Sequence, residues 1–83
     1  AAMSERTFLR RFKAAVGMAP LDWLRQARMA RARELLEQTP RSIEEVAEQC
    51  GYQTAQAFRL TFRALVGVAP GAYRRRFGAY PAE

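Results

Sequence analysis

The sequence predicts an all-helical chain in which two helix-turn-helix units are joined by one long helix. Three observations lead to this prediction. A segment of 22 residues occurs twice, apolar residues recur at the three- and four-residue spacing of helices, and capping residues and prolines stand where helices should begin. With 83 residues, of which 49% are hydrophobic, the chain is long and apolar enough for one small folded domain and is not a disordered chain.

The repeat has an offset of 50 residues. Residues 4–25 and 54–75 are identical at eight of 22 positions, which is more than a chance alignment gives. The identical pairs are Phe8/Phe58, Phe12/Phe62, Ala14/Ala64, Val16/Val66, Gly17/Gly67, Ala19/Ala69, Pro20/Pro70 and Arg25/Arg75. The two copies should therefore form the same structure twice.

Each copy predicts one helix, over residues 4–16 and 54–66. In the first copy Ser4 is a capping residue, and Phe8 and Phe12 lie one turn apart on one helix face. Gly17 suits the left-handed residue that ends a helix. The second copy has the same residue types at the same places.

A long linker helix is expected over residues 20–38. Pro20 suits a first helical position, and the chain then has no glycine or proline before Pro40. We expect one stripe along this helix to pack inward, formed by Leu21, Leu24, Arg28, Arg31 and Leu35, with Ala27 and Ala32 beside it. Arg28 should bury its stem and pair with a carboxylate; the alternative is a phosphate contact.

A shorter helix is expected over residues 42–50, and a last one over residues 70–77. Ser42 and Glu45 have the spacing of a capping box, and Gly51 provides a turn before Thr54 begins the next helix. A short helix, a tight turn with glycine and a second helix form a helix-turn-helix. Cys50 should pack in its core.

The composition argues against an enzyme and a metal site. The chain has no histidine, which is the commonest general base, and only one cysteine, so neither a zinc site nor an internal disulfide is expected. We expect no catalytic residue and no cofactor. The single thiol and the lack of a long apolar segment favour a cytoplasmic protein.

The charge indicates a polyanionic partner. The net charge is +6, and 13 of the 14 basic residues are arginine, whose flat guanidinium forms paired hydrogen bonds to phosphate and guanine. No acidic residue lies between Glu48 and Glu83, where five arginines stand. A helical protein-interaction or anionic-surface module without sequence reading is the main alternative, but such a module does not need two matching helices.

These motifs together resemble a known family. Residues 43–52 (IEEVAEQCGY), then Phe58, Phe62 and residues 67–74 (GVAPGAYR), are similar to the signature of the AraC/XylS transcription regulators. The linker helix has residues that match the family pattern Y-L-x3-R-x3-A-x2-L-L, namely Trp23, Leu24, Arg28, Ala32, Leu35 and Leu36. The resemblance covers residues 3–77.

The resemblance implies a homeodomain-like fold whose two recognition helices enter successive major grooves of double-stranded DNA. It implies a transcription activator or repressor, a separate N-terminal effector or dimerisation domain, and RNA polymerase as a candidate partner. Ala19 and Ala69 replace the Ser or Thr that members often have there, so these two caps should be weak.

By the repeat, a helix equivalent to residues 42–50 would precede Ala1, with Ala1 matching Gly51 and Met3 matching Gln53. We therefore expect residues 1–83 to be a single DNA-binding domain fragment. Residues 1–19 would be the remainder of the first helix-turn-helix, 20–38 the linker helix, and 42–77 the second helix-turn-helix with the final helix. The phenylalanine face of the first helix should then be partly exposed or covered by self-association.

Base contacts are expected on the helix faces opposite the paired phenylalanines. A helical wheel places Arg6, Arg10 and Lys13 outermost in the first copy, and Gln56, Leu60 and Arg63 in the second. The resemblance adds Leu9, Ala55 and Arg59 to the base-contacting positions. We predict base contacts by Arg6, Arg10, Gln56, Arg59 and Leu60. For Arg6 and Arg10 a phosphate contact or a solvated side chain stays open.

The other exposed bases are expected to bind phosphates, which gives affinity without sequence information. They are Lys13, Arg41, Arg63, Arg74, Arg75 and Arg76. For the run 74–76 a solvated tail is the alternative.

Overall fold

The computed structural model describes residues 4–79, and its helices begin and end within one residue of where the sequence predicts. There are five: α1 (Glu5–Val16), α2 (Pro20–Gln38), α3 (Ile43–Gln49), α4 (Ala55–Val66) and α5 (Pro70–Phe77). These described residues contain no β-strand, so the all-helical prediction is confirmed. The expected matches of Ala1 and Met3 to the second copy lie outside them.

The helices of the two repeat copies begin and end in the same way. The Ser4 and Thr54 hydroxyls accept hydrogen bonds from backbone amides of the first turn. Gly17 and Gly67 have φ of 92° and 98°, the left-handed conformation that ends α1 and α4. Ala19 and Ala69 provide no side-chain cap before the prolines that open α2 and α5, as expected.

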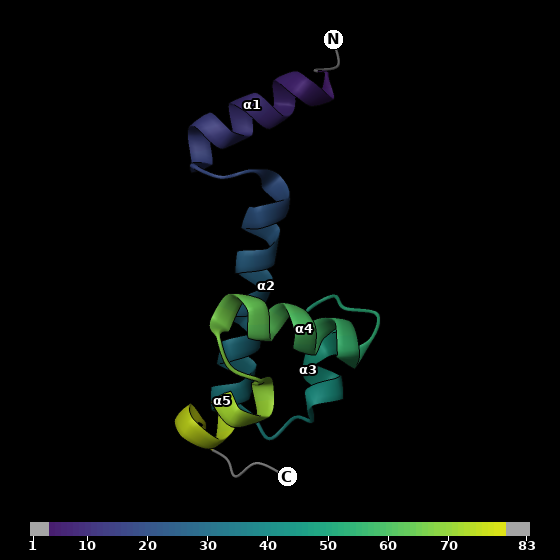
Figure 1. Cartoon of the computed structure of the whole chain (residues 1–83), viewed down its shortest axis with the longest axis vertical. Helices are drawn as coiled ribbons and strands as arrows, with labels where there is room; N and C mark the ends of the chain where they lie inside the picture. Colours follow the sequence, from purple (N-terminus) through teal and green to yellow (C-terminus); the bar gives the residue numbers. More distant parts are fainter. Residues whose placement is uncertain (1–3, 80–83) are drawn as a thin grey trace.

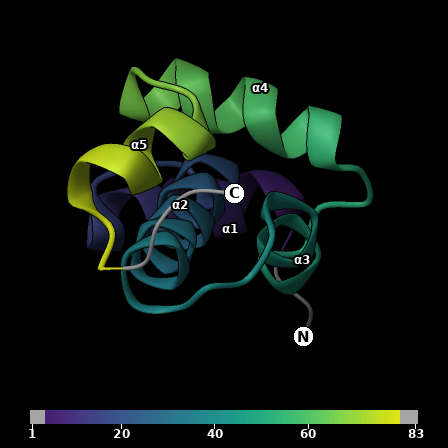
Figure 2. The same cartoon turned by 90° about the horizontal axis from the view of Figure 1, so that it is seen from below.

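The helices are arranged around α2, which contacts each of the other four. Figure 1 shows α1 at the N-terminal end of α2, and α3, α4 and α5 around its C-terminal half. Seen along α2 in Figure 2, α3 lies on one side of it, and α4 and α5 together on another. The molecule is elongated, with extents of 51 × 22 × 19 Å. None of these helices is long and apolar enough to cross a membrane.

One hydrophobic core lies between the C-terminal half of α2 and helices α3 to α5. Its fully buried side chains include Met29, Leu36, Val46, Phe58 and Phe62. Cys50 is also buried here, which confirms its predicted place, and burial raises the pKa of its thiol. The capping box of Ser42 and Glu45 is present at the start of α3. The second helix-turn-helix is therefore a well-packed unit.

The predicted inward stripe of α2 is only partly correct. Ala32 and Leu35 are buried, but so are Met29 and Leu36, whereas Leu21 is 56% exposed. The N-terminal half of α2 packs against α1, and the C-terminal half packs against α3, α4 and α5. The side of α2 that faces its neighbours therefore differs between the two halves.

Among residues 4–79, Arg28 does not pair with a carboxylate as predicted. Its guanidinium lies 5.3 Å from the centre of the Tyr52 ring and within 3.4 Å of where a Cβ on Gly51 would stand. It forms a cation–π contact that covers the turn of the second helix-turn-helix.

Side chains of the last helix, α5, form hydrogen bonds to the C-terminal end of α2. The Tyr73 hydroxyl donates a hydrogen bond to the Glu37 carboxylate. The Arg74 guanidinium donates to the carbonyl oxygens of Leu36, at 3.2 Å, and Thr39, at 3.3 Å. Carbonyls at the end of a helix have no partner within the helix, so Arg74 acts as a side-chain cap for α2.

The phenylalanine face of α1 is less buried than the equivalent face of α4. Phe8 is 47% exposed and Phe12 half-buried, whereas their equivalents Phe58 and Phe62 are completely buried. Phe12 packs edge-on against Trp23 of α2, with 6.2 Å between ring centres. Residues 4–79 hold no helix before α1 that could take the place of α3. The expected partial exposure of this face is confirmed.

Candidate nucleic-acid interface

The outer face of α1 carries three exposed cations, Arg6, Arg10 and Lys13. The inward side of the helix is fixed by Phe12, which contacts Trp23 of α2. Since residues three to four apart share a helix face, Arg6, Arg10 and Lys13 project from the other side. Leu9 lies beside them and is 42% exposed. This face can offer guanidinium groups to a polyanion.

The outer face of α4 is more sharply defined, because the opposite face is fully buried. Gln56 and Arg63 are exposed and Leu60 is 66% exposed, while Phe58 is 0% exposed. The wheel therefore gave the correct orientation of this helix. Ala55 is half-buried against the core. Beside Leu60 lies a shallow hollow to which α2 contributes Arg25, a residue that the sequence did not single out.

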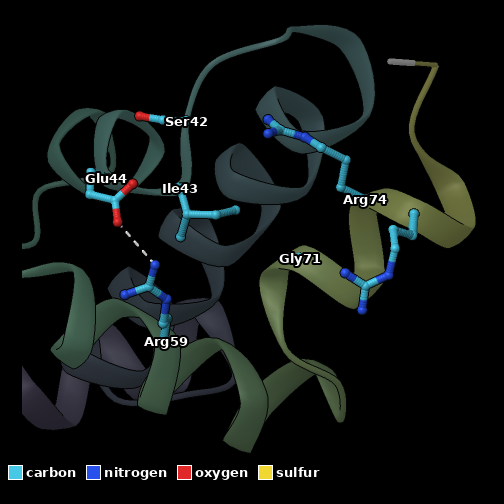
Figure 3. A pocket seen from close by; sticks show the side chains of 7 residues that line it. Ser42, Ile43, Glu44, Arg59, Gly71 and Arg74 are labelled. Atoms are coloured by element: carbon cyan, nitrogen blue, oxygen red, sulfur yellow. Dashed lines mark hydrogen bonds and ion pairs between the residues drawn. The ribbon is translucent and has the colours of Figure 1, made fainter. Parts of the chain in front are cut away.

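The guanidinium of Arg59 is turned toward α3. Its Nη2 lies 3.0 Å from a carboxylate oxygen of Glu44 on α3, and Figure 3 shows this ion pair at the edge of a pocket. Hydrogen bonds from the backbone amide of Glu44 and then from Arg59 lower the pKa of this carboxyl. Sequence reasoning missed Glu44, because the two residues are 15 positions apart on different helices.

The structure places Arg74 unlike an exposed phosphate-binding side chain. The side chain is only 4% exposed, and its guanidinium is already occupied by the carbonyls of Leu36 and Thr39. Its neighbours Arg75 and Arg76 are exposed. The repeat offers a signal for this difference, because the offset of 50 pairs Arg74 with the apolar Leu24 and Arg75 with Arg25.

Arg41 precedes α3 and remains available to solvent. Its side chain is 43% exposed, and its nearest carboxylate oxygen, on Glu45, is 4.0 Å away. An exposed ion pair at this distance holds its partners weakly. Because Arg41 directly precedes α3, it lies beside the start of that helix and is separate from the cations of α1.

The exposed bases that the sequence singled out for DNA contacts form three groups: the α1 face, the α4 face, and the region where α3, α4 and α5 meet. Exposed polar and basic side chains on the outer faces of two matching helices suit contacts with phosphates and base edges.

Comparison with known proteins supports this description. The family model described as a helix-turn-helix domain matches residues 1–76. The HTH-type transcriptional activator RhaR of Pectobacterium atrosepticum is 40% identical over 74 residues, which cover 89% of this chain and 26% of that protein. The chain thus spans about a quarter of the length of this curated relative.

Solved structures show the same fold. The DNA-binding domain of the transcriptional factor AdpA, solved in complex with a target DNA, has a TM-score of 0.86 and 45% identity over 90% of this chain and 68% of that one. The C-terminal domain of AraT, a response regulator from Geobacillus stearothermophilus, has a TM-score of 0.89 and 35% identity over 94% of this chain and 64% of that one. The chain belongs to the family of AraC-type helix-turn-helix domains.

Proposed function

We propose that this chain is the sequence-specific DNA-binding part of a transcription regulator, and that α1 and α4 enter successive major grooves. The observation that carries the proposal is the pair of matching helices with exposed polar outer faces, held by one continuous helix. An anionic-surface module would need charge but not this duplication. The two helices would then be about 34 Å apart, one turn of DNA.

Base contacts are proposed for Arg6 and Arg10 on α1 and for Gln56 and Leu60 on α4. An arginine can pair with the O6 and N7 of guanine, and a glutamine with adenine, whereas a leucine can only touch the methyl group of thymine. We expect α1 to contribute more of the specificity for this reason. Phosphate contacts are proposed for Lys13, Arg41, Arg63, Arg75 and Arg76.

We also infer a wider setting from the relatives. The matched relatives are named as transcriptional activators or regulators and are about four times longer than the matched segment. The full protein would be a cytoplasmic, non-enzymatic regulator, with an effector or dimerisation domain elsewhere and RNA polymerase as a partner.

The test compares base-contacting and phosphate-contacting residues on two DNAs. A target site is first selected from random duplexes with the 83-residue chain, and affinities are then measured for this site and for random DNA at several salt concentrations. Arg10→Ala should cost about 1–3 kcal/mol on the site and relax the preference at one or two base pairs. Arg63→Ala should weaken both DNAs alike and lower the salt slope by about one.

The two variants serve as controls for each other, because each removes one exposed arginine. If Arg10→Ala lowers both affinities by the same factor, Arg10 binds the backbone and the α1 face does not read sequence. If the unmodified chain has the same affinity for every duplex, the proposal of sequence-specific binding is wrong.

A further inference from the structure

A pocket lies where α3, α4 and α5 meet, and neither sequence reasoning nor the comparisons assign it a role. It has a volume of about 220 Å³, and Glu44, Arg59, Gly71, Arg74 and Arg75 are among its lining residues (Figure 3). This is several times the roughly 30 Å³ that a water molecule occupies in the liquid. We call it the arginine pocket.

The arginine pocket is lined by three cations and one carboxylate. Arg74 is buried and uses two of its five N–H donors at the end of α2, so it contributes mainly positive charge to the pocket. Arg59 and Arg75 are exposed. The Nη1 of Arg75 lies 3.7 Å from where a Cβ on Gly71 would stand, so this guanidinium lies along α5 beside the pocket. The opening therefore has a positive balance and two guanidinium groups with donors to spare.

We propose that the arginine pocket binds a phosphodiester group of the DNA backbone through Arg59 and Arg75, and that Glu44 holds Arg59 in the free protein until the phosphate replaces it. The inference rests on the proposed function and replaces one prediction made from the sequence, the base contact of Arg59. Arg59 contacts the backbone and does not read a base.

The Arg59 side chain points in a different direction from the residues of α4 proposed to contact bases. Gln56 and Leu60 lie on the outer face of α4, whereas the Arg59 guanidinium is turned toward α3, 3.0 Å from Glu44. A guanidinium can form two parallel hydrogen bonds to phosphate oxygens as readily as to a carboxylate. A phosphate can therefore replace Glu44 as the partner of the Arg59 guanidinium.

The exchange needs little free energy, because the ion pair is exposed. The side chains of Arg59 and Glu44 are 48% and 66% exposed, and pairs of this kind hold weakly. Glu44 thus competes with phosphate for Arg59 and also repels the backbone. Its removal should raise affinity for every DNA sequence, by about two- to fivefold.

The experiment measures binding of four variants to the selected site, to its single-base-pair variants and to random DNA across a salt series. The variants are Arg59→Ala, Glu44→Gln, the double variant of both, and Glu48→Gln. Glu48 is an exposed carboxylate on α3 outside the pocket, so it reports the general effect of losing one negative charge.

Arg59→Ala should weaken the site and random DNA by the same factor, lower the salt slope by about one, and leave base preference unchanged. Glu44→Gln should tighten both DNAs more than Glu48→Gln does, and this excess should vanish in the double variant. A loss of preference at one base pair in Arg59→Ala would show that Arg59 reads a base, and the inference would be wrong. An excess that persists in the double variant would also overturn it, since Glu44 would then act without Arg59.

Two further results distinguish this inference from binding of a free phosphorylated molecule and from failure of the proposed function. Inorganic phosphate is titrated into the DNA-free chain at constant ionic strength while the arginine Nε–H signals are followed by NMR. Only weak, unsaturated shifts are expected; tight saturation would assign the pocket to a free phosphorylated molecule. If the unmodified chain shows no sequence preference, the proposed function fails, but Arg59→Ala on random DNA still tests the arginine pocket.

Discussion

Replacing Arg74 should destabilise the fold and not only weaken DNA binding. Arg74→Ala removes hydrogen bonds to the carbonyls of Leu36 and Thr39, at 3.2 and 3.3 Å. Hydrogen bonds to charged groups contribute about 1.5–3 kcal/mol, and these two are long, so together they supply about 2–3 kcal/mol. The buried part of the side-chain stem adds about 1–1.5 kcal/mol. The free energy of unfolding should therefore fall by about 3–4.5 kcal/mol.

That loss is large for a domain of this size, whose stability is expected to be about 4–12 kcal/mol. Urea unfolding followed by far-UV circular dichroism measures it, beside Arg74→Lys and Arg76→Ala. A lysine can satisfy one carbonyl but not both, so Arg74→Lys should lose about half as much. Arg76 is exposed in the same run, and its removal should leave the urea midpoint almost unchanged.

DNA binding of the same variants decides between the two roles. Random-DNA affinity is measured at low temperature, where each variant is still folded by its circular dichroism. Arg74→Ala should then bind random DNA with a smaller loss than Arg76→Ala. An unchanged urea midpoint together with weaker DNA binding would refute the capping role and restore Arg74 as a phosphate contact.

Four further substitutions test the packing of the two units and the cap of α3. Phe58→Ala should lower the free energy of unfolding by about 3–5 kcal/mol because it empties a fully buried site, whereas Phe8→Ala, at a residue 47% exposed, should cost clearly less in the same urea experiment. Equal costs would contradict the difference in burial between the repeats. The hydroxyl of Tyr52 is buried without a hydrogen-bond partner among the described residues, so Tyr52→Phe should raise the urea-derived stability by about 1 kcal/mol, and a loss would mean that the hydroxyl is bonded after all. The backbone amide of Ser42 lowers the pKa of Glu45 below its usual 4.5, so this carboxylate stabilises the fold above that pH, and the contribution is lost as the pH falls through the folded-state pKa. Glu45→Gln should make the acid-side decline of the urea midpoint shallower, and an unchanged decline would show that other groups cause it.

The helix boundaries could be predicted because local residues decide them. Pro20 at the start of α2 and Thr39-Pro40 after its end leave few alternatives, and the structure begins and ends α2 at Pro20 and Gln38. Likewise Ser42 and Glu45 fix the start of α3 through hydrogen bonds within three residues of each other. Such features depend on neighbours in sequence, which a sequence shows directly.

The contacts between helices were harder to predict. Met29 was missed as a core residue because α2 changes its buried face between the two units, and a single stripe does not describe such a helix. Arg74 looks like Arg75 and Arg76 in the sequence, yet its position over the end of α2 makes it a cap. The pairing of Arg59 with Glu44 depends on the angle between α3 and α4, which no local pattern gives.

The unbroken course of α2 makes the separation of the two recognition helices depend on the number of its residues. α2 runs from Pro20 to Gln38 without interruption. One residue inserted between Leu24 and Met29 would move one unit by about 1.5 Å and rotate it by about 100° relative to the other. In the proposed complex, α1 would then point away from the groove next to that of α4. Insertion of seven residues would nearly restore the angle but add about 10 Å. In that proposed complex, substitutions in α1 and α4 would change which bases are bound, whereas any change in the length of α2 would alter the phase between the two half-sites.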